Sequence, residues 1–358
     1  MKKIIIGIVA VILIIVGVSY FTKNSSQPSV KEPIKIGVIL PLTGDAAFIG
    51  EAAKNSAILA KESFGKTKNT YELVFEDDQI DSKKTVLAFR KLVDMNNIKA
   101  VITGFSGPGN AIAPLAEKEH VIHFSIGSTD TTIPKNKKFV FSHWLLPEKQ
   151  AEVYIKEAKI RGLKKIAMIV VNQQGTIATR EALLKEDPTI FILKNDTISP
   201  EERDFRTIIT KAKNEKADAL MLLILPGQLT STVKQIKDLG ITVPLTSAGS
   251  VEHEKEAVSL LEGQWYVNPG GPSDTFVEKY KEKYGNLPQI GSGNVYDVIN
   301  ILISSFEKSK GVENVVNIIS EIKDFPGVMG VLDMDSEGII SGTAIVKKII
   351  NGKFVEVK

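Results

Sequence analysis

The sequence predicts an α/β protein with parallel sheets that helices cover on both faces. Short apolar runs alternate with amphipathic stretches from Ile34 onward, and the same alternation restarts after Pro147. The length of 358 residues suffices for two ordinary domains. We therefore expect two α/β units, with additional elements near the end of the chain.

The elements of the first unit follow from local periodicity. After the apolar run IKIGVIL, Ala53, Ala57 and Ala60 recur at helical spacing, and Tyr71 and Leu73 alternate with polar residues as in a half-buried strand. Later runs repeat this pattern. The predicted strands are 34–40, 71–78, 99–105 and 120–126, and the predicted helices include 82–96 and 110–118.

The second unit shows the same alternation with clearer end signals. Ser199-Pro200-Glu201-Glu202 is typical of a helix start, with a serine cap and proline at the first helical position. Asn351-Gly352 is typical of a two-residue hairpin turn. The predicted strands are 164–171, 189–193 and 217–225, and the predicted helices are 148–161, 200–214, 228–239, one ending at Tyr284, 295–308 and 312–322.

Loops at one edge of these sheets are the candidate site. In open parallel sheets, ligands bind beyond the carboxyl ends of the strands. The loops that follow those ends are 41–50, 77–82, 104–109, 126–132 and 172–176.

Composition excludes several classes of partner and chemistry. The net charge of +3 comes from lysines before Ile34, and basic and acidic residues balance in the rest of the chain. We therefore expect no nucleic-acid partner. The chain has no cysteine, which excludes thiol catalysis, thiolate metal sites, disulfides and a lipid-modified cysteine.

The N-terminus predicts a membrane segment. Lys2-Lys3 precedes an uncharged apolar run at 4–21, which is long enough to span a membrane. No small-x-small cleavage site follows, so we expect a signal anchor at 1–21 and a polar linker at 22–33, with cleavage left as an alternative. Lysines before the run favour a cytoplasmic N-terminus, which places the remainder outside.

Several blocks of the chain, in order, carry a family resemblance. They are IKIGVILPLTGDAAFIGEAAKNSAILA, EDDQIDSKKTVLAFRKLV, AVITGFSGPGNAIAPLAEKEHVIHFSIGSTD, ERDFRTIITKAKNEKADALML, NVYDVINILISSF and GVMGVLDMDSEG. These blocks resemble type I periplasmic-binding-fold proteins of the branched-chain amino acid (Leu/Ile/Val) binding family, which are solute receptors of ABC importers. The resemblance covers most of residues 34–340.

The resemblance implies a two-lobed α/β fold that clamps a small ligand in its cleft. The lobes would be discontinuous: 34–143 plus 273–330, and 144–272 plus 331–358. It also implies an extracytoplasmic binding protein without enzymatic activity, with an ABC permease as its partner.

Ser106, in the stretch GFSGPGN, has two alternative roles. A hydrolase elbow needs G-x-S-x-G, but Pro108 stands where the second glycine belongs, and the four histidines suggest no triad by spacing. As a binding residue, Ser106 lies between a strand and a helix N-terminus, where a ligand carboxylate fits. In the resembling family, this serine and the segment now occupied by Gly127, Ser128 and Thr129 hold the carboxylate and amino groups. Simple helix capping by Ser106 and Thr129 is the remaining alternative.

The second lobe departs from the family pattern. The family often has an aromatic residue where this chain has Gln174, and its acidic residue for the ligand ammonium falls on Gly249, with Glu252 three positions later. A tyrosine-type position of the first lobe falls on Ile49, beside Phe48. A buried ammonium needs an anion or several acceptors, so we expect a carboxylate without an amine, an amide or another small polar solute, unless Glu252 substitutes. The expected ligand-binding residues are Ser106, Gly127, Ser128, Thr129, Phe48, Gln174, Gly249 and Glu252.

Other assignments remain open or lack support. Phe48 and Trp144 are candidates for an apolar part of the site or for plain core, and Asp77 and Asp78 for ligand contacts or for a turn. No metal-ligand spacing and no nucleotide-binding loop occurs in the sequence, so we expect no cofactor. A ligand-sensing receptor ectodomain and, less favoured, a serine hydrolase are the alternatives to a transport receptor.

Overall fold

The computed structural model describes residues 32–249, 251–309 and 311–357. The predicted signal anchor at 1–21 lies outside the described residues, as does the predicted linker except for its last two positions. In the described part, no helix is long and apolar enough to cross a membrane. The residues from Ile34 onward form one structural unit that contains two separate parallel sheets.

The first sheet has six strands, all parallel, in the order β13-β5-β4-β3-β1-β2. Val38, on the second strand from one edge, is paired with Phe75 on one side and Ile102 on the other. The predicted parallel sheet is therefore confirmed. The strands are β1 (Ile34–Leu40), β2 (Tyr71–Asp77), β3 (Ala100–Gly104), β4 (Ile122–Ile126), β5 (Val140–His143) and β13 (Ile339–Ile340).

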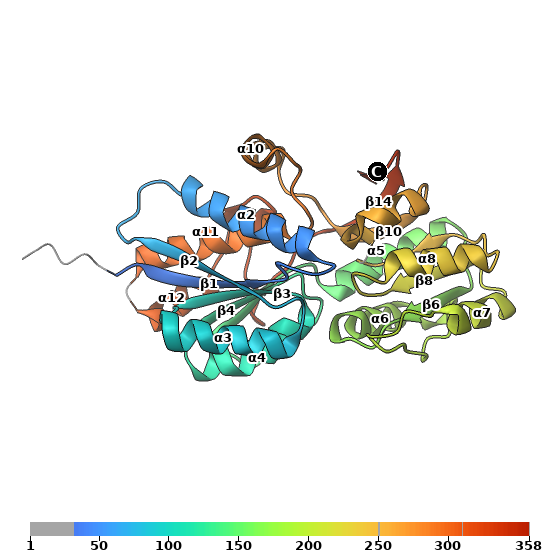
Figure 1. Ribbon diagram of the computed structural model, residues 1–358, viewed down its shortest axis with the longest axis horizontal. Coiled ribbons are helices and arrows are strands. Elements are labelled where there is room, and N and C mark those ends of the chain that lie inside the picture. Colours follow the sequence, from blue (N-terminus) through green and yellow to red (C-terminus); the bar gives the residue numbers. More distant parts are fainter. Residues whose placement is uncertain (1–31, 250, 310, 358) are drawn as a thin grey trace, which may run out of the picture. The chain divides into compact units, whose positions relative to one another are not determined.

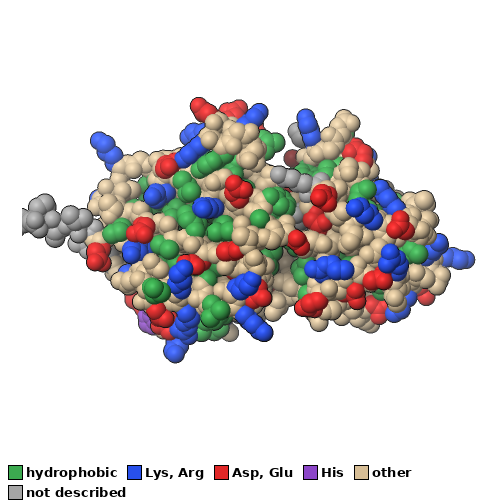
Figure 2. Space-filling model, viewed as in Figure 1, with side chains coloured by type: hydrophobic (Ala, Val, Ile, Leu, Met, Phe, Trp, Pro, Cys, Tyr) green, Lys and Arg blue, Asp and Glu red, His purple; other side chains and the backbone are tan. Residues whose placement is uncertain are grey.

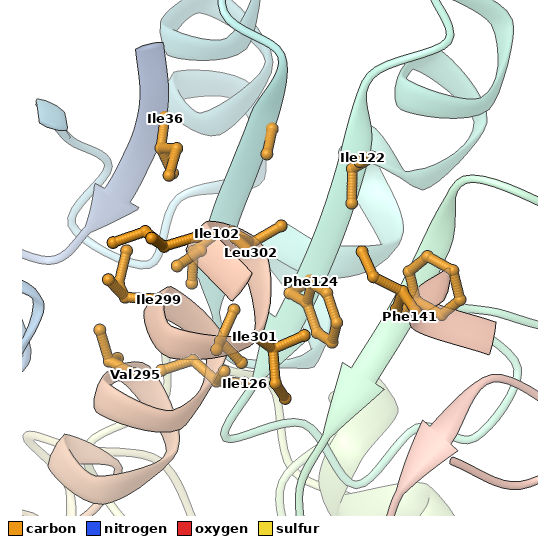
Figure 3. Close-up of a cluster of buried hydrophobic side chains, with 14 of the residues drawn as sticks. Ile36, Ile102, Ile122, Phe124, Ile126, Phe141, Val295, Ile299, Ile301 and Leu302 are labelled. Carbon is orange, nitrogen blue, oxygen red and sulfur yellow. The ribbon is translucent and has the colours of Figure 1, made fainter. Parts of the chain in front are cut away.

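Helices cover both faces of this sheet (Figure 1). The sheet residues that face α11 include Ile36, Ile102 and Phe124, which pack with Val295 and Ile299 of that helix (Figure 3). Neighbouring positions such as Ile39 and Val101 point to the other face, which explains the unbroken apolar runs. The helices are α2 (Ala47–Ser63), α11 (Ser292–Lys308) and α12 (Val312–Ser320) on one face, α3 (Ser82–Asn96) and α4 (Ser106–Lys118) on the other, and α10 (Asp274–Tyr284) beside α2.

The second parallel sheet has the order β7-β6-β8-β9. Its two faces are buried by different helices, α5 and α6 against one face and α7 and α8 against the other. The strands are β6 (Ile166–Val170), β7 (Phe191–Ile192), β8 (Ala219–Leu223) and β9 (Leu245–Thr246). The helices are α5 (Pro147–Ile160), α6 (Gln174–Glu186), α7 (Arg206–Asn214), α8 (Leu229–Asp238) and α9 (Lys255–Val258), with 3-10 turns η1 (Pro188–Ile190), η2 (Val251–His253) and η3 (Ser259–Leu261).

An antiparallel sheet of three strands, β10-β14-β15, adjoins the second sheet through a bridge between Ala248 and Val267. Asn351 and Gly352 both have positive φ, at 51° and 68°, as the predicted hairpin turn requires. The strands are β10 (Trp265–Pro269), β14 (Ala344–Ile350) and β15 (Lys353–Glu356), and a separate short pair is formed by β11 (Phe325–Gly327) and β12 (Gly330–Leu332).

The predicted helix start at Ser199 is wrong. The helix begins only at Arg206, and the Ser199 hydroxyl bonds to the Glu201 carboxylate. The side-chain amide of Gln228 donates to the carbonyl oxygens of Pro200 and Glu202, each at 3.1 Å. Those carbonyls are therefore held in a turn beside α8 rather than in a first helical turn.

The chain stays with the first sheet beyond residue 330, where the predicted boundary between the lobes lies. Ile339 and Ile340 pair with β5, and Leu332, Met334 and Ile340 are buried in the core of the first sheet. Burial of these apolar side chains explains why residues 331–340 pack there. Of the described residues after 330, the hairpin of β14 and β15 is the part that packs with β10, beside the second sheet.

Charged side chains of both signs are interspersed over the face shown in Figure 2. The balanced composition after residue 33 agrees with this distribution. A face of this kind presents no basic track for a phosphate backbone.

Candidate ligand-binding cleft

A cleft of about 660 Å³ lies at the carboxyl ends of strands from both parallel sheets. All five loops that the sequence analysis selected contribute to its lining. The volume is in the range typical of small-molecule sites. The lining combines apolar groups such as Ile49 and Trp144 with polar groups that include Ser106, Thr129 and Gln174.

Ser106 is the first residue of α4 and lines the cleft while being only 3% exposed. The residue before it, Phe105, has a φ of 65°, a left-handed turn that carries the chain from β3 into the helix. The Ser128 hydroxyl donates to Ser106 Oγ at 3.0 Å. An oxygen that accepts this bond keeps its own proton for a second partner. Together with the first N–H groups of α4, Ser106 forms a donor cluster suited to an anion.

The loop after β4 provides the neighbouring part of the lining. Gly127 and Thr129 line the cleft, whereas Ser128 lies behind Ser106, is buried and does not. Thr129 Oγ1 donates to the carbonyl oxygen of Gly175 at 2.8 Å. This bond links a loop of the first sheet directly to the start of α6, which flanks the second sheet.

Gly175 is required at this contact because no side chain fits there. A Cβ at this position would lie 2.8 Å from Ser106 Oγ and 2.9 Å from Thr129 Oγ1, closer than real Cβ contacts. The neighbouring Gln174 lines the cleft, as expected. Gln173 Oε1 accepts a hydrogen bond from Gly175 N at 2.8 Å and so caps α6.

Asp77 and Asp78 do not line the cleft. They lie behind its first wall, which is formed by the loops that follow strands of the first sheet. Asp77 Oδ1 accepts from the backbone N–H of Leu42 at 2.8 Å and of Thr43 at 3.3 Å. Although burial opposes it, hydrogen bonding from Thr43 and from backbone N–H groups lowers the pKa of Asp77. Asp78 is buried, and this burial raises its pKa from 3.8 to about 6. The turn role that the sequence analysis left open fits both carboxylates.

The second wall of the cleft is formed by residues around the second sheet. Gly249 belongs to its lining, and Glu252 does not. Glu252 Oε1 lies 2.8 Å from Lys347 Nζ and accepts hydrogen bonds from Tyr266 Oη at 3.0 Å and Asn268 Nδ2 at 2.8 Å. Burial, reinforced by the Glu252 charge, raises the pKa of Tyr266, so the phenol remains a donor. Glu252 is therefore paired with a cation, and its Oε1 is held by three side chains behind the wall. Phe48, also expected at the site, does not line the cleft; its neighbour Ile49 does.

Gln150 is a lining residue that sequence reasoning missed. It lies on α5, is 1% exposed, and belongs to the same buried helix face as Ala151 and Tyr154. A glutamine on the apolar face of the predicted helix 148–161 was the available signal. Helix periodicity alone gives no reason to place that face beside a ligand.

A nucleophilic role for Ser106 finds no base beside it. Among the described residues, no histidine lines the cleft. His143 and Asp297 lie 3.7 Å apart, but both are completely buried outside the lining. His123 bonds to Thr103, and burial lowers its pKa to about 3. Within the described ranges, no group of three or more potential metal ligands is found.

Comparisons with known proteins agree with this architecture. A family model described as periplasmic binding protein matches residues 33–345. The Leu/Ile/Val-binding protein BraC3 of Rhizobium johnstonii is 23% identical over 314 residues, which cover 83% of this chain and 85% of that protein.

Two solved structures illustrate the fold and the range of ligands. The leucine binding protein LivK of Thermotoga maritima superposes with a TM-score of 0.83 at 22% identity, covering 91% of this chain and 98% of that one. A solute binding protein of an ABC transporter from R. palustris, in complex with benzoate, has a TM-score of 0.79 at 17% identity and covers 91% and 96%. At these identities the likeness shows the fold.

Proposed function

The chain belongs to the periplasmic binding protein family, a family of solute-binding rather than catalytic proteins, and from this premise we propose that it is the extracytoplasmic solute receptor of an ABC importer. In this proposal the segment at 1–21 anchors the protein to the membrane and an ABC permease receives the ligand-bound form. The ligand is a small carboxylate, an amide or a related polar solute.

The donor cluster at Ser106 is the observation that carries this proposal. Ser106 Oγ and the N–H groups at the start of α4 line a cleft of about 660 Å³. A carboxylate placed there accepts charge-assisted hydrogen bonds and meets the positive end of the helix. The carboxylate is thus the part of the ligand for which the site is best prepared.

An amine-free ligand fits this cleft better than a zwitterionic amino acid. Among the described lining residues, the carboxylates are Asp45, Asp81 and Glu201, and all three are exposed. Asp81 caps α3, and Glu201 is bonded to Ser199. Since an ammonium in a buried subsite needs an anion nearby, its desolvation would remain uncompensated here.

The test is a binding screen of the purified chain by calorimetry. The panel contains branched-chain and other amino acids, aliphatic and aromatic carboxylates, and their amides. We expect an amine-free carboxylate to bind, and Ser106→Ala to weaken it about tenfold to a hundredfold, because one hydrogen bond to a charged group is lost. The matched control is Ser56→Ala, which removes a buried helix hydroxyl bonded to Ala52 O in α2, outside the lining. Silence of the entire panel, or binding indifferent to Ser106, would contradict the proposal.

A further inference from the structure

The second wall of the cleft presents an amide oxygen that no protein group satisfies. Gln150 lines the cleft and is 1% exposed. Its Nε2 donates to the carbonyl oxygen of Val267 at 3.1 Å. Its Oε1 has no hydrogen-bond partner among the described residues.

The orientation of this amide is fixed by its surroundings. Because the carbonyl of Val267 can only accept, it must face the nitrogen of Gln150, which leaves the oxygen as the group that lacks a partner. The same logic applies to the fully buried Asn268, whose Nδ2 donates to Glu252 Oε1 at 2.8 Å and whose Oδ1 is unsatisfied. The two amides are therefore set as acceptors.

Gly249 also lines the cleft and lies beside these two amides. A Cβ at Gly249 would come within 3.2 Å of Gln150 Nε2 and 3.7 Å of Asn268 Oδ1. Its φ of 109° also disfavours any residue with a side chain. The position where relatives of this fold are expected to carry an acid therefore has no side chain, and amide groups lie directly behind it.

The part of this wall around Gln150 and Gly249 is rich in acceptors, and the carboxylate behind it is paired. Glu252 lies beside Lys347, and both side chains are about nine-tenths buried. A buried acceptor without a donor costs free energy, and a ligand that supplies a donor recovers it. A neutral donor does so without the desolvation cost of an unpaired ammonium.

We propose that Gln150 Oε1 is the second anchoring point for the ligand and selects solutes that present a neutral donor, an amide N–H or a hydroxyl. This inference rests on the proposed function, because it assumes that the cleft binds a small solute. It assigns the ligand two ends: an acid for the first wall and an uncharged donor for the second.

Two matched series of carboxylates test it by calorimetry on the purified chain. The aliphatic series is succinamate, levulinate and γ-aminobutyrate; the aromatic series is terephthalamate, para-acetylbenzoate and para-(aminomethyl)benzoate. Within each series the far end is an amide, a methyl ketone or an ammonium on a closely similar frame. We expect the amide to bind about tenfold more tightly than the ketone in at least one series, because one neutral hydrogen bond is gained.

Two variants of Gln150 locate the preference. Gln150→Met should abolish the ratio between amide and ketone, and Gln150→Glu should shift the preference towards the ammonium compound. The control is Gln264→Met, since Gln264 is a half-buried glutamine whose Oε1 accepts from Leu245 N at 2.8 Å, and neither residue lines the cleft. Thermal unfolding of each variant shows whether it is folded.

Each outcome is decisive. If the amide and the ketone bind equally tightly, water satisfies Gln150 Oε1 and the inference is overturned. Because both compounds bind, the proposed function stays intact. A ratio that survives both Gln150 variants would also overturn it. If all six compounds are silent but an amino acid from the wider panel binds, the ammonium is preferred: the inference and the amine-free choice of ligand both fail, while the role as a solute receptor stands. Silence of every compound in both experiments would overturn both proposals.

Discussion

The two walls of the cleft obtain their polar groups in different ways. On the first wall, Ser106, Gly127 and Thr129 lie in loops that directly follow strands. On the second wall, Gly249 stands where the family resemblance led us to expect an acid. The buried polar group there is Gln150, which lies on α5, the helix that precedes the second sheet in the chain. Loop position therefore locates the first wall and the loop 172–176 of the second, whereas the place of Gln150 depends on how a helix packs.

This difference separates anchoring from selection. The first wall offers a helix N-terminus and a hydroxyl, which suit almost any carboxylate. The second wall offers a neutral acceptor, and the described carboxylate behind it, Glu252, is paired with Lys347, so we expect this wall to distinguish ligands by their other end. Specificity in this molecule is expected to change mainly through substitutions on the second wall.

Forcing the two walls apart should have the largest effect. Gly175→Val places a Cβ within 2.9 Å of both Ser106 Oγ and Thr129 Oγ1. Overpacking of this kind costs about 1–3 kcal/mol, so we expect the affinity for every ligand to fall by up to about a hundredfold. Calorimetric titration measures the loss. Gly271→Val is the matched control, because nothing lies within 4 Å of its Cβ position. A loss confined to some ligands would contradict a simple separation of the walls.

Neutralising Glu252 should affect stability and leave ligand preference unchanged. Glu252→Gln leaves Lys347 without its ion pair, and we expect the free energy of unfolding to fall by about 2 kcal/mol. Urea unfolding measures this change, with the exposed Glu278→Gln as the control. If affinity for amine-bearing ligands fell selectively, Glu252 would reach the ligand and the second wall would not be neutral.

The first wall should show a smaller dependence on pH through Asp78. Its pKa is about 6 in the folded protein against an ordinary 3.8, so the folded state retains the proton longer than the unfolded chain. Stability should therefore fall as the pH rises from about 4 to about 6 and level off above that range.

Asp78→Asn should remove this slope and raise the free energy of unfolding at neutral pH by about 1 kcal/mol, because an amide is never charged. The Asn oxygen can accept from Ile80 N as Asp78 does at 3.0 Å, and its nitrogen can face Thr85 Oγ1. Unfolding curves at several pH values measure the slope. A variant with the slope of the parent would assign the titration to another group.

Strand and loop positions were predictable because they depend on local patterns. The runs at 34–40 and 71–78 became β1 and β2, and Asn351-Gly352 became a hairpin turn. The false helix start at Ser199 shows the limit of such patterns, because a distant side chain, Gln228, binds the carbonyls on which it depends. The pairing of Ile339 with β5 is similarly long-range and had no local signal.

Part of the lining was predictable on each wall. Ser106 and Thr129 on the first wall and Gln174 and Gly249 on the second line the cleft. Glu252 does not, and it is paired with Lys347, a residue 95 positions away in the chain. Gln150 is buried in the cleft lining through packing of α5 against β10 and β14. Neither the pairing nor this packing is encoded by spacing along the sequence.

The pairing of β14 with β10 has a consequence for the order in which the protein matures. During synthesis, Gly249 and Asn268 leave the ribosome well before Lys347, which is carried by β14. Until β14 docks, Glu252 lacks its cation and can attract an ammonium or a metal ion instead. Until then the second wall is acidic and unselective, and the first sheet likewise waits for β13, which directly precedes β14 in the chain. Discrimination between ligands is acquired late, when the hairpin closes over β10.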